Sequence, residues 1–454
     1  MKLPSTTNKP CVKSTIGTKV TTIDERQTTS PFKDFFPTRF ILDQNDECAT
    51  YFLVSSFYSS SKEVSTTTTT TTTIPILSNK TVPSLVSSKP KEKNTIRVAV
   101  VVSLAKQTSH IAEFHLLYDS WRFLEHFSPL SQQVKVDLIV FCEQPSCSQL
   151  PSFCLPLSFN NKLQPNPSCF YEELSVKIVE EWNDYLYMTS IAFLLTPQYR
   201  STILKYDWIL RVDQDAIISP ALLFGLLDKH PVKLYDMQFG STGHGTEFTY
   251  KRIRDIAKKL GYKHMGIHNL CSTWLVHPND SIQIANLTTL IGRHFLKNEY
   301  GPHVSGIENL PAIGEWPKWW RGVTSLYAAS IAINHIYSST IAAHHQSPAI
   351  DHPSFSTSSI WHAWHIHSLH NSEPFAKFQH RDHLQEFIKE DPTKRIIRMS
   401  NTTYTQEVLN AVIKEFHEIY YNNGKFNGII SVRTYVTALA WQKAHAATGA
   451  INLN

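Results

Sequence analysis

The feature that most constrains this chain is a short apolar run that ends in two closely spaced carboxylates. The run Trp208-Ile209-Leu210-Arg211-Val212 predicts a strand that is buried on both faces of a sheet. Asp213-Gln214-Asp215 follows it, and Ser219-Pro220 then begins a second apolar run that predicts a helix, with Ser219 as N-cap. Side chains two apart on an extended chain point the same way, so we expect both carboxylates to face one ligand. Ligands of open α/β sheets bind beyond the carboxyl ends of strands, where this pair lies.

The carboxylate pair has two interpretations, and so has the arginine before it. Two adjacent carboxylates repel, and Mg²⁺ or Mn²⁺ would offset the repulsion, because both ions bind through one or two carboxylates together with substrate phosphates. Asp213 and Asp215 are therefore predicted metal ligands, the alternative being ordinary turn and cap residues. Arg211 either neutralises the carboxylates and reaches a phosphate, or it is a salt-bridge partner buried in the sheet.

Composition places the chain among globular proteins and argues against some partners. The 454 residues are 42% hydrophobic and 18% charged, which suits a large buried core. The net charge of +5 is dispersed, without a Lys/Arg-rich run, so we expect no nucleic-acid partner. No window of about 20 residues is apolar enough to span a bilayer, so no transmembrane helix is predicted.

The N-terminal part differs in composition from the rest. Residues 1–94 are dominated by Ser, Thr, Lys and Pro and include an unbroken threonine run at 66–73, which predicts a disordered or stem region. Residues 95–454 are predicted to form the functional domain with two closing helices at its end. The first residues lack the apolar core of a signal peptide. Either the protein is not secreted by the usual route, or this N-terminus is incomplete.

Cysteines and glycosylation sequons bear on the compartment. Four of the seven cysteines lie between 142 and 169 without the Cys-x-x-Cys spacing of a zinc site, so they form disulfides in an oxidising lumen or remain reduced thiols. In a lumen we expect a disulfide from the loop cysteines Cys147, Cys154 or Cys169, with Cys142 as a buried thiol. Asn-x-Ser/Thr sequons begin at Asn79, Asn279, Asn286 and Asn401. These features favour the Golgi lumen or secretory pathway. They conflict with the absence of a visible signal peptide or membrane anchor.

The order of apolar segments predicts an α/β fold. A β-branched run at 96–104, an amphipathic helix at 110–127 and a second strand at 136–141 make a βαβ unit. Residues 171–196 are predicted to be mostly helical. Further on we expect short strands at 235–239 and 268–276, and helices at 246–260, 327–337, 403–421 and 430–447. The tryptophans around 316–320 either stack on sugar rings or pack a core.

This order resembles the GT-A class of glycosyltransferases, which use nucleotide-diphospho-sugars. In that class a Rossmann-like half ends in an Asp-x-Asp motif that holds a divalent metal on the donor diphosphate, and Asp213-Gln214-Asp215 resembles that motif. His268-Asn269-Leu270-Cys271-Ser272 resembles the Asn-x-Gly strand that lines the donor sugar, with Cys271 where glycine is usual. The resemblance implies a GT-A-like, Rossmann-type mixed sheet flanked by helices. More narrowly, it points to a eukaryotic subgroup. The donor-binding residues that it implies are Arg211, Asp213, Asn269 and Ser272.

A late histidine completes the metal site in some GT-A families, and the segment Trp361–His367 offers candidates. As a strand, this segment would put His365 and His367 on one face and Trp364 and Ile366 on the other. We therefore predict His365 or His367 as the third ligand, with a preference for His367, since one imidazole is an acceptable addition for Mn²⁺. The alternative is that they are surface or core residues in a chain with 22 histidines.

The predicted function is metal-dependent transfer of a sugar, of hexosyltransferase type, from a nucleotide-sugar donor to a glycan or glycoprotein acceptor. Glu308, Glu315 and Asp351 are the candidate general bases for an inverting reaction, and a retaining reaction would need none. Two alternatives stay open. One is a non-catalytic GT-A-fold protein that binds glycans or partners, and the other is a metal-dependent phosphoesterase or nucleotidyl transferase.

Overall fold

The computed structural model describes most of the predicted domain. The described residues are 95–106, 108–127, 130–157, 166–227, 237–240, 245–270, 273–301, 314–315, 319–338, 349–367, 402–422 and 430–447. The predicted stem, residues 1–94, lies outside them, so its disorder stays a prediction. No helix within these ranges combines the length and apolar character that a membrane crossing requires.

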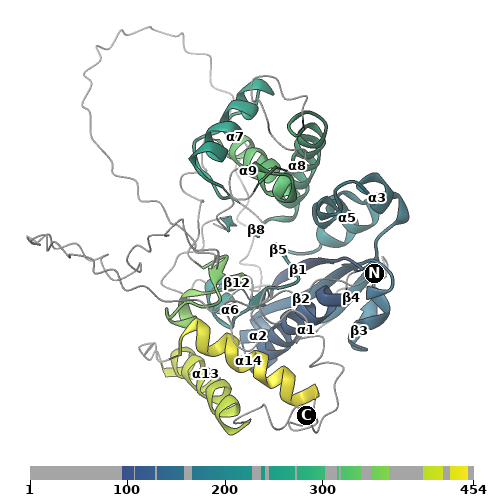
Figure 1. Cartoon of the computed structure of the whole chain (residues 1–454). Coiled ribbons are helices and arrows are strands. Elements are labelled where there is room, and N and C mark those ends of the chain that lie inside the picture. Colours follow the sequence, from purple (N-terminus) through teal and green to yellow (C-terminus); the bar gives the residue numbers. More distant parts are fainter. Residues whose placement is uncertain are drawn as a thin grey trace, which may run out of the picture. The chain divides into compact units, whose positions relative to one another are not determined.

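A seven-stranded mixed sheet is the centre of the fold (Figure 1). Its strand order is β3-β4-β2-β1-β5-β8-β7. The first five strands in this order are parallel to their neighbours, whereas β8 is antiparallel to both β5 and β7. The predicted α/β class with a mixed sheet is confirmed. The bounds of the strands are β1 Ile96–Leu104, β2 Val134–Cys142, β3 Cys154–Pro156, β4 Cys169–Glu173, β5 Trp208–Val212, β7 Gln238–Phe239 and β8 Trp274–Val276.

The central strands form because their sequences are almost continuously apolar. From Val98 to Val102 every side chain of β1 is fully buried, as a strand covered on both faces requires. Val101 in β1 pairs with Arg211 in β5, which places the arginine inside the sheet. The predicted strand at 268–276 is shorter than expected, since β8 begins at Trp274.

One face of the sheet is covered by α1 and the C-terminal helices. Even-numbered residues of β1, such as Val98 and Val100, belong to this core. The ring centroids of Phe123 and Tyr435 are 5.8 Å apart, and Phe127 meets Phe416 at 5.7 Å. The two predicted closing helices are confirmed. The helices are α1 Thr108–Phe123, η1 Leu124–Phe127, α2 Leu130–Gln133, α6 Ala221–Leu226, α13 Thr402–Asn422 and α14 Val432–Ala447.

The other face is covered by short helices and by α8 and α9. Phe141 of β2 stacks on Phe193 with ring centroids 4.2 Å apart. Residues 171–196 were expected to be mostly helical, and they are, although β4 occupies the start and the helical part is divided into short segments. The elements on this face are α3 Val176–Glu181, η3 Leu186–Met188, α4 Thr189–Ala192, η4 Phe193–Leu195, α5 Pro197–Ile203, α8 Pro278–Asn298 and α9 Thr324–Ile336.

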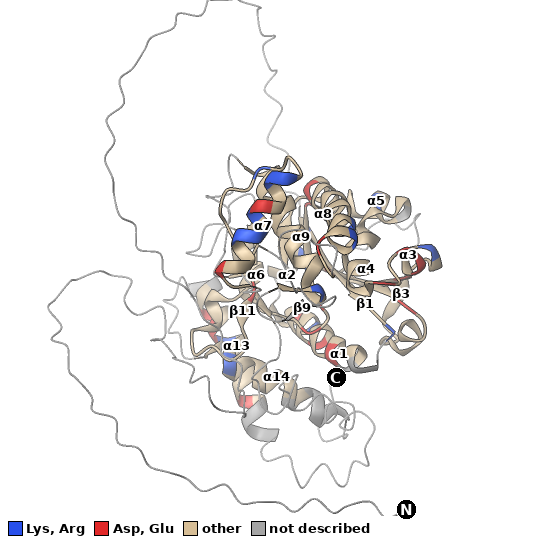
Figure 2. Ribbon diagram, turned by 45° about the horizontal axis from the view of Figure 1, so that its top comes forward, with Lys and Arg blue, Asp and Glu red and all other residues tan. Residues whose placement is uncertain are grey.

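A third apolar cluster joins α7 (Glu247–Lys259) to α8 and α9. Trp319 is buried here and stacks on Tyr327 with ring centroids 4.6 Å apart, so this tryptophan packs a core. Lys, Arg, Asp and Glu follow one another along α7 (Figure 2). The remaining elements are η2 Ser146–Gln149, η5 Arg321–Val323 and η6 Ile360–His362. A two-stranded sheet pairs β9 Gly314–Glu315 with β10 Trp319–Trp320.

A three-stranded sheet lies beside the carboxyl end of β5. It contains β6 (Ile217–Ile218), β12 (His365–His367) and β11 (His352–Pro353), in the order β11-β12-β6. The sequence pattern did not predict β6. The N-cap prediction was also wrong by one residue, because Pro220 is the N-cap of α6. The Ser219 hydroxyl accepts from the Ala221 N–H at 3.1 Å and donates to the Ala363 carbonyl, which ties the helix start to the segment before β12.

Candidate functional site

The acidic segment after β5 is a turn. The Ala216 N–H donates to the Asp213 carbonyl at 3.3 Å, so residues 213–216 close on themselves rather than run extended as expected. The side chain of Asp213 is 28% exposed, whereas Asp215 is buried. The two aspartates lie at the carboxyl end of β5, as predicted, but in different environments. That both face one ligand stays a prediction.

Arg211 is an internal partner of Asp213. Its Nη1 lies 2.7 Å from Asp213 Oδ1, and its Nη2 donates to Ser190 Oγ at 2.9 Å. The guanidinium also lies 5.7 Å from the ring centroid of Trp274 on β8. The side chain is 5% exposed, which fits the buried salt-bridge interpretation. An ion pair of this kind holds Asp213 in one orientation at the edge of the sheet.

The three-stranded sheet brings the histidine segment to the same edge. β12 pairs antiparallel with β6, with His365 opposite Ile218 and Ile366 opposite Ile217. Continuing that register places His367 opposite Ala216, next to Asp215 in the chain. Trp364 and Ile366 pack in the core, while His365 and His367 both approach Asp351, so the predicted alternation of faces is confirmed.

Asp351 and the two histidines form a buried cluster. His365 Nδ1 lies 3.3 Å from Asp351 Oδ1, and His367 Nδ1 lies 3.9 Å from the same oxygen. The Asp351 and His365 side chains are fully buried, and His367 is 18% exposed. Burial by itself raises the pKa of Asp351, but the hydrogen bond with His365 and the charges of His367 and His365 outweigh it, so the pKa is lowered. The carboxylate therefore stays ionised.

Gly240 and Thr273 bring the last strands of the large sheet to this cluster. The Gly240 N–H, just after β7, donates to the Thr273 carbonyl at 2.9 Å. The Thr273 side chain also favours the ionised form of Asp351. A Cβ on Gly240 would lie 1.8 Å from Asp351 Oδ2, so only glycine lets the carboxylate approach this backbone. Asp351 thus joins the small sheet to β7 and to the start of β8.

Asn269 lies in a second polar cluster before β8. Its φ of +61° is a left-handed value, shared among described non-glycine residues only with Asp351 at +57°. Its amide donates to Tyr250 Oη at 3.1 Å. Tyr250 stacks on His268, whose Nε2 meets Arg254 Nη1 at 2.8 Å. Burial, followed by the charge of Arg254, lowers the pKa of His268 to about 4.

For three other predicted site residues the structure gives little or no side-chain position. Ser272 and Glu308 lie outside the described residues. Glu315 is in β9, where its backbone pairs with Trp319, and its side chain is not described. Among the three candidate bases, the structure therefore positions the carboxylate of Asp351 alone.

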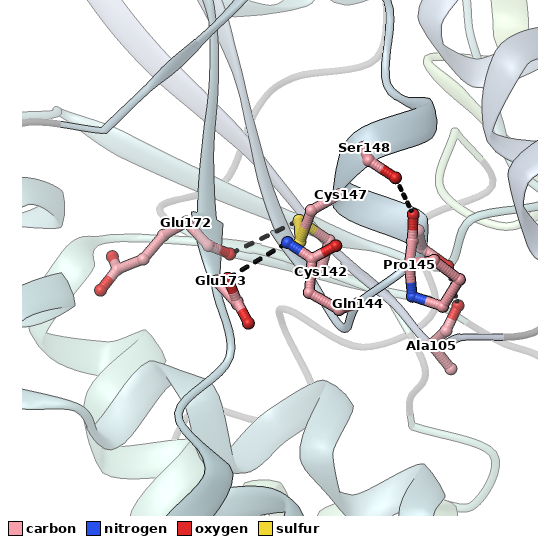
Figure 3. The surroundings of a disulfide bond; sticks show 9 residues. Ala105, Cys142, Gln144, Pro145, Cys147, Ser148, Glu172 and Glu173 are labelled. Atoms are coloured by element: carbon pink, nitrogen blue, oxygen red, sulfur yellow. Dashed lines mark hydrogen bonds between the residues drawn. A yellow bond between two sulfur atoms is a disulfide. The ribbon is translucent and has the colours of Figure 1, made fainter.

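The described residues contain two disulfides, one of which lies at the carboxyl end of β2 (Figure 3). Cys142 pairs with Cys147 and Cys154 pairs with Cys169, so the prediction that Cys142 is a thiol was wrong. The turn after β2 brings the Cα atoms of Cys142 and Cys147 to 5.2 Å, which allows the bond. The same turn is tied to β1, because Ser146 Oγ donates to the Ala105 carbonyl at 2.8 Å.

A family model described as "Domain of unknown function (DUF7164)" matches residues 92–453. The chain belongs to the DUF7164 family. No curated protein matches it. Among solved structures, mouse xyloside xylosyltransferase 1 in its apo form is similar, with a TM-score of 0.30 and 11% identity, over 54% of this chain and 83% of that one. Identity and TM-score at this level are too low to indicate an activity.

The DUF7164 domain has two buried acidic residues, one of them in contact with the acidic segment, that sequence reasoning missed. Glu143 follows β2 directly and is buried, and its burial raises the pKa of the carboxyl group despite the opposing charge of Lys106. Glu113 of α1 is also buried, and its Oε2 accepts from the Gln214 amide at 3.1 Å. Glu143 could have been found, because it lies two residues after the predicted strand at 136–141. Glu113 could have been found as an acidic residue on the apolar face of the predicted helix.

The side chains at this edge of the DUF7164 domain are of types that bind hard cations. Carboxylates from Asp213 and Asp215 and an imidazole from His367 are acceptable ligands for Mn²⁺. His365 Nε2 is buried and has no hydrogen-bond partner among the described residues, as an atom reserved for a ligand would be. Within the described ranges, however, no three His, Cys, Asp or Glu side chains gather closely enough to hold a metal ion. The residues fit the metal by chemistry, and their convergence on it stays a proposal.

Proposed function

We propose that this DUF7164 domain is a metal-dependent glycosyltransferase that moves a sugar from a nucleotide-diphosphate donor to a glycan or glycoprotein acceptor. The observation that supports it is the meeting of two separate segments at one sheet edge. Asp213 and Asp215 follow the carboxyl end of β5, and β12, which carries His365 and His367, pairs with β6 just after them in the chain. A donor diphosphate would fit this edge because ligands of open α/β sheets bind there.

In this proposal Asp213, Asp215 and His367 hold Mn²⁺ or Mg²⁺ on the donor diphosphate. When bound, the metal supplies Lewis-acid stabilisation of the charge that develops on the leaving diphosphate. Arg211 holds the Asp213 carboxylate through the 2.7 Å ion pair. The Asp351 carboxylate lies 3.3 Å from His365 Nδ1 and 3.9 Å from His367 Nδ1, so its charge would help to orient both imidazoles.

The remaining residues are assigned to donor and acceptor chemistry. Asn269 presents its side chain from a left-handed backbone position before β8, and we propose that it contacts the donor sugar together with Ser272. Glu308, Glu315 and Asp351 remain the candidate bases for an inverting reaction. Asp351 is buried and engaged by both histidines, so a base role would require donor binding to open those contacts.

One observation favours a second candidate, a non-catalytic GT-A-fold protein that binds glycans or partners. Asp213 already has a strong partner in Arg211. An aspartate neutralised in this way has less need of a cation. A domain of the second kind would fold normally and bind sugars without needing Mn²⁺ and without releasing a nucleoside diphosphate.

The test is thermal unfolding of the protein with UDP-sugars and GDP-sugars, each with Mn²⁺ and each with a chelator. A ligand that binds the folded state at one hundred times its dissociation constant stabilises it by about 2.7 kcal/mol. We expect a rise in melting temperature with at least one donor only when Mn²⁺ is present. The Asp255→Asn variant, which removes an exposed aspartate of α7 paired with Lys251, should show the same rise as the parent. No Mn²⁺-dependent rise with any donor would count against the proposal.

A further inference from the structure

The outer face of α8 carries two glycosylation sequons. Asn279-Asp280-Ser281 lies in the first turn of the helix and Asn286-Leu287-Thr288 lies two turns later. Both asparagines are exposed. Seven residues are almost two full turns at about 3.6 residues per turn, so both side chains leave the helix on the same side.

The exposed positions of α8 around these two asparagines are uncharged. The exposed residues next to them on this face are Gln283 and Leu290, and the Leu290 side chain is 55% exposed; the charged residues Arg293 and Lys297 are exposed farther along the helix. By contrast, the solvent face of α7 is rich in Lys, Arg, Asp and Glu (Figure 2). A covering of hydrophilic sugar over this stretch would provide the hydration that charged side chains provide on α7.

The disulfides are an independent observation that bears on the compartment. Cys142–Cys147 and Cys154–Cys169 account for all four cysteines between 142 and 169. Disulfides form and persist in oxidising compartments such as the endoplasmic reticulum lumen and are rare in the cytosol. A chain that matures in such a compartment is also exposed to the enzyme that modifies Asn-x-Ser/Thr sequons.

We propose that α8 is an N-glycosylated helix, modified at Asn279 and Asn286. In the reaction the side-chain amide nitrogen of each asparagine bonds to the anomeric carbon of an oligosaccharide carried on a lipid diphosphate. The bond from that carbon to the diphosphate oxygen breaks, and the lipid diphosphate leaves with the electron pair, while the amide loses one proton. The assignment is independent of the proposed sugar transfer at the sheet edge.

The packing of α8 requires that the asparagines are modified before the helix is folded into the domain. Ser281 is buried and its hydroxyl accepts from Trp274 Nε1 at 3.2 Å, and Thr288 is buried as well. These two hydroxyl residues complete the sequons, so the modifying enzyme cannot reach them once α8 has packed. Glycan addition therefore precedes the docking of α8 on the sheet, and the exposed asparagines allow the folded domain to keep its glycans.

The test is peptide mass spectrometry of the full chain from its native cells, before and after an amidase that releases N-glycans. That amidase leaves aspartate in place of each modified asparagine. We expect Asp at positions 279 and 286 only in the treated sample. An asparagine that remains unmodified before and after treatment overturns the assignment at that position.

Variants of the full chain, expressed in eukaryotic cells, give a second readout. Asn279→Gln and Asn286→Gln should each change the electrophoretic mobility by the mass of one glycan. Thr288→Ser preserves the sequon at Asn286, so this variant should migrate like the parent. Asn298→Gln is the matched control, since Asn298 is an exposed asparagine of the same helix outside any sequon. Mobility of both Asn279→Gln and Asn286→Gln that is identical to that of Asn298→Gln would overturn the proposal, whatever the amidase does at the other sequons.

Discussion

His365 Nδ1 lies 3.3 Å from Asp351 Oδ1, and neither side chain has any exposed surface. The pair connects β12 to the residue that precedes β11, and it faces the backbone of Gly240 after β7. A buried carboxylate between two imidazoles is costly unless all of its partners are in place. The cluster is therefore a structural link between the small sheet and the large one, as well as a support for the proposed metal ligand.

Removal of the Asp351 carboxylate should destabilise the fold. Breaking a buried charged pair by deleting one partner costs about 3–5 kcal/mol. We expect Asp351→Ala to lower the free energy of unfolding, measured by urea denaturation, by an amount in this range. Asp255→Ala should change it by no more than about 0.5 kcal/mol, because Asp255 is exposed. Equal effects of the two variants would contradict the structural role of Asp351.

Gly240→Ala should destabilise the fold through the same carboxylate. The added Cβ would lie 1.8 Å from Asp351 Oδ2, and overpacking of this kind costs about 1–3 kcal/mol. In the double variant with Asp351→Ala the clash disappears, so the two effects should not add. Urea denaturation of both single variants and the double variant gives the coupling. Strict additivity would show that Gly240 and Asp351 do not meet.

The two disulfides should differ in their contribution to stability. Cys154–Cys169 spans 15 residues and Cys142–Cys147 spans 5. In the loop-entropy description, closing a 15-residue loop is worth about 3 kcal/mol, and a shorter loop is worth less. We expect the Cys154→Ser/Cys169→Ser variant to lose more stability than Cys142→Ser/Cys147→Ser. The reverse order in urea denaturation would mean that the turn after β2 depends on its own disulfide for packing.

The histidines before β8 should make the fold sensitive to acid. Burial lowers the pKa of His264 to about 3 and that of His268 to about 4, against about 6.5 in an unfolded chain. The unfolded state then binds more protons below about pH 6.5, so this stability is present above that pH and is lost as the pH falls toward the folded values. When the pH is lowered from about 6.5 to about 4, we expect the free energy of unfolding to fall less in His268→Gln than in the parent. Parallel curves of urea midpoint against pH would contradict this expectation.

The central sheet could be predicted from the sequence because its strands have a strong local signal. The runs at 96–104, 136–141 and 208–212 are continuous and apolar, and each is a strand of the sheet. The position of Asp213 and Asp215 at a strand end follows from the same pattern.

The small sheet could not be predicted in the same way. β6 and β11 have two residues each, too few for any periodicity, and β6 pairs with a strand that is more than 130 residues away in the chain. Gly240 could not be linked to Asp351 for the same reason. Cys142 was misassigned because its burial at a strand end was read without the turn that returns Cys147 to it.

The most direct test of the proposed function is calorimetric titration of a nucleotide-sugar donor into the protein with Mn²⁺. Asp213→Asn and Asp215→Asn remove one charge each and keep the side-chain size, and Asp255→Asn is the exposed control. We predict that the parent and the control bind the donor in a Mn²⁺-dependent manner. Each site variant should lose at least tenfold in affinity, about 1.4 kcal/mol, at a temperature where it is still folded. Unchanged Mn²⁺-dependent affinity in both site variants would contradict the account.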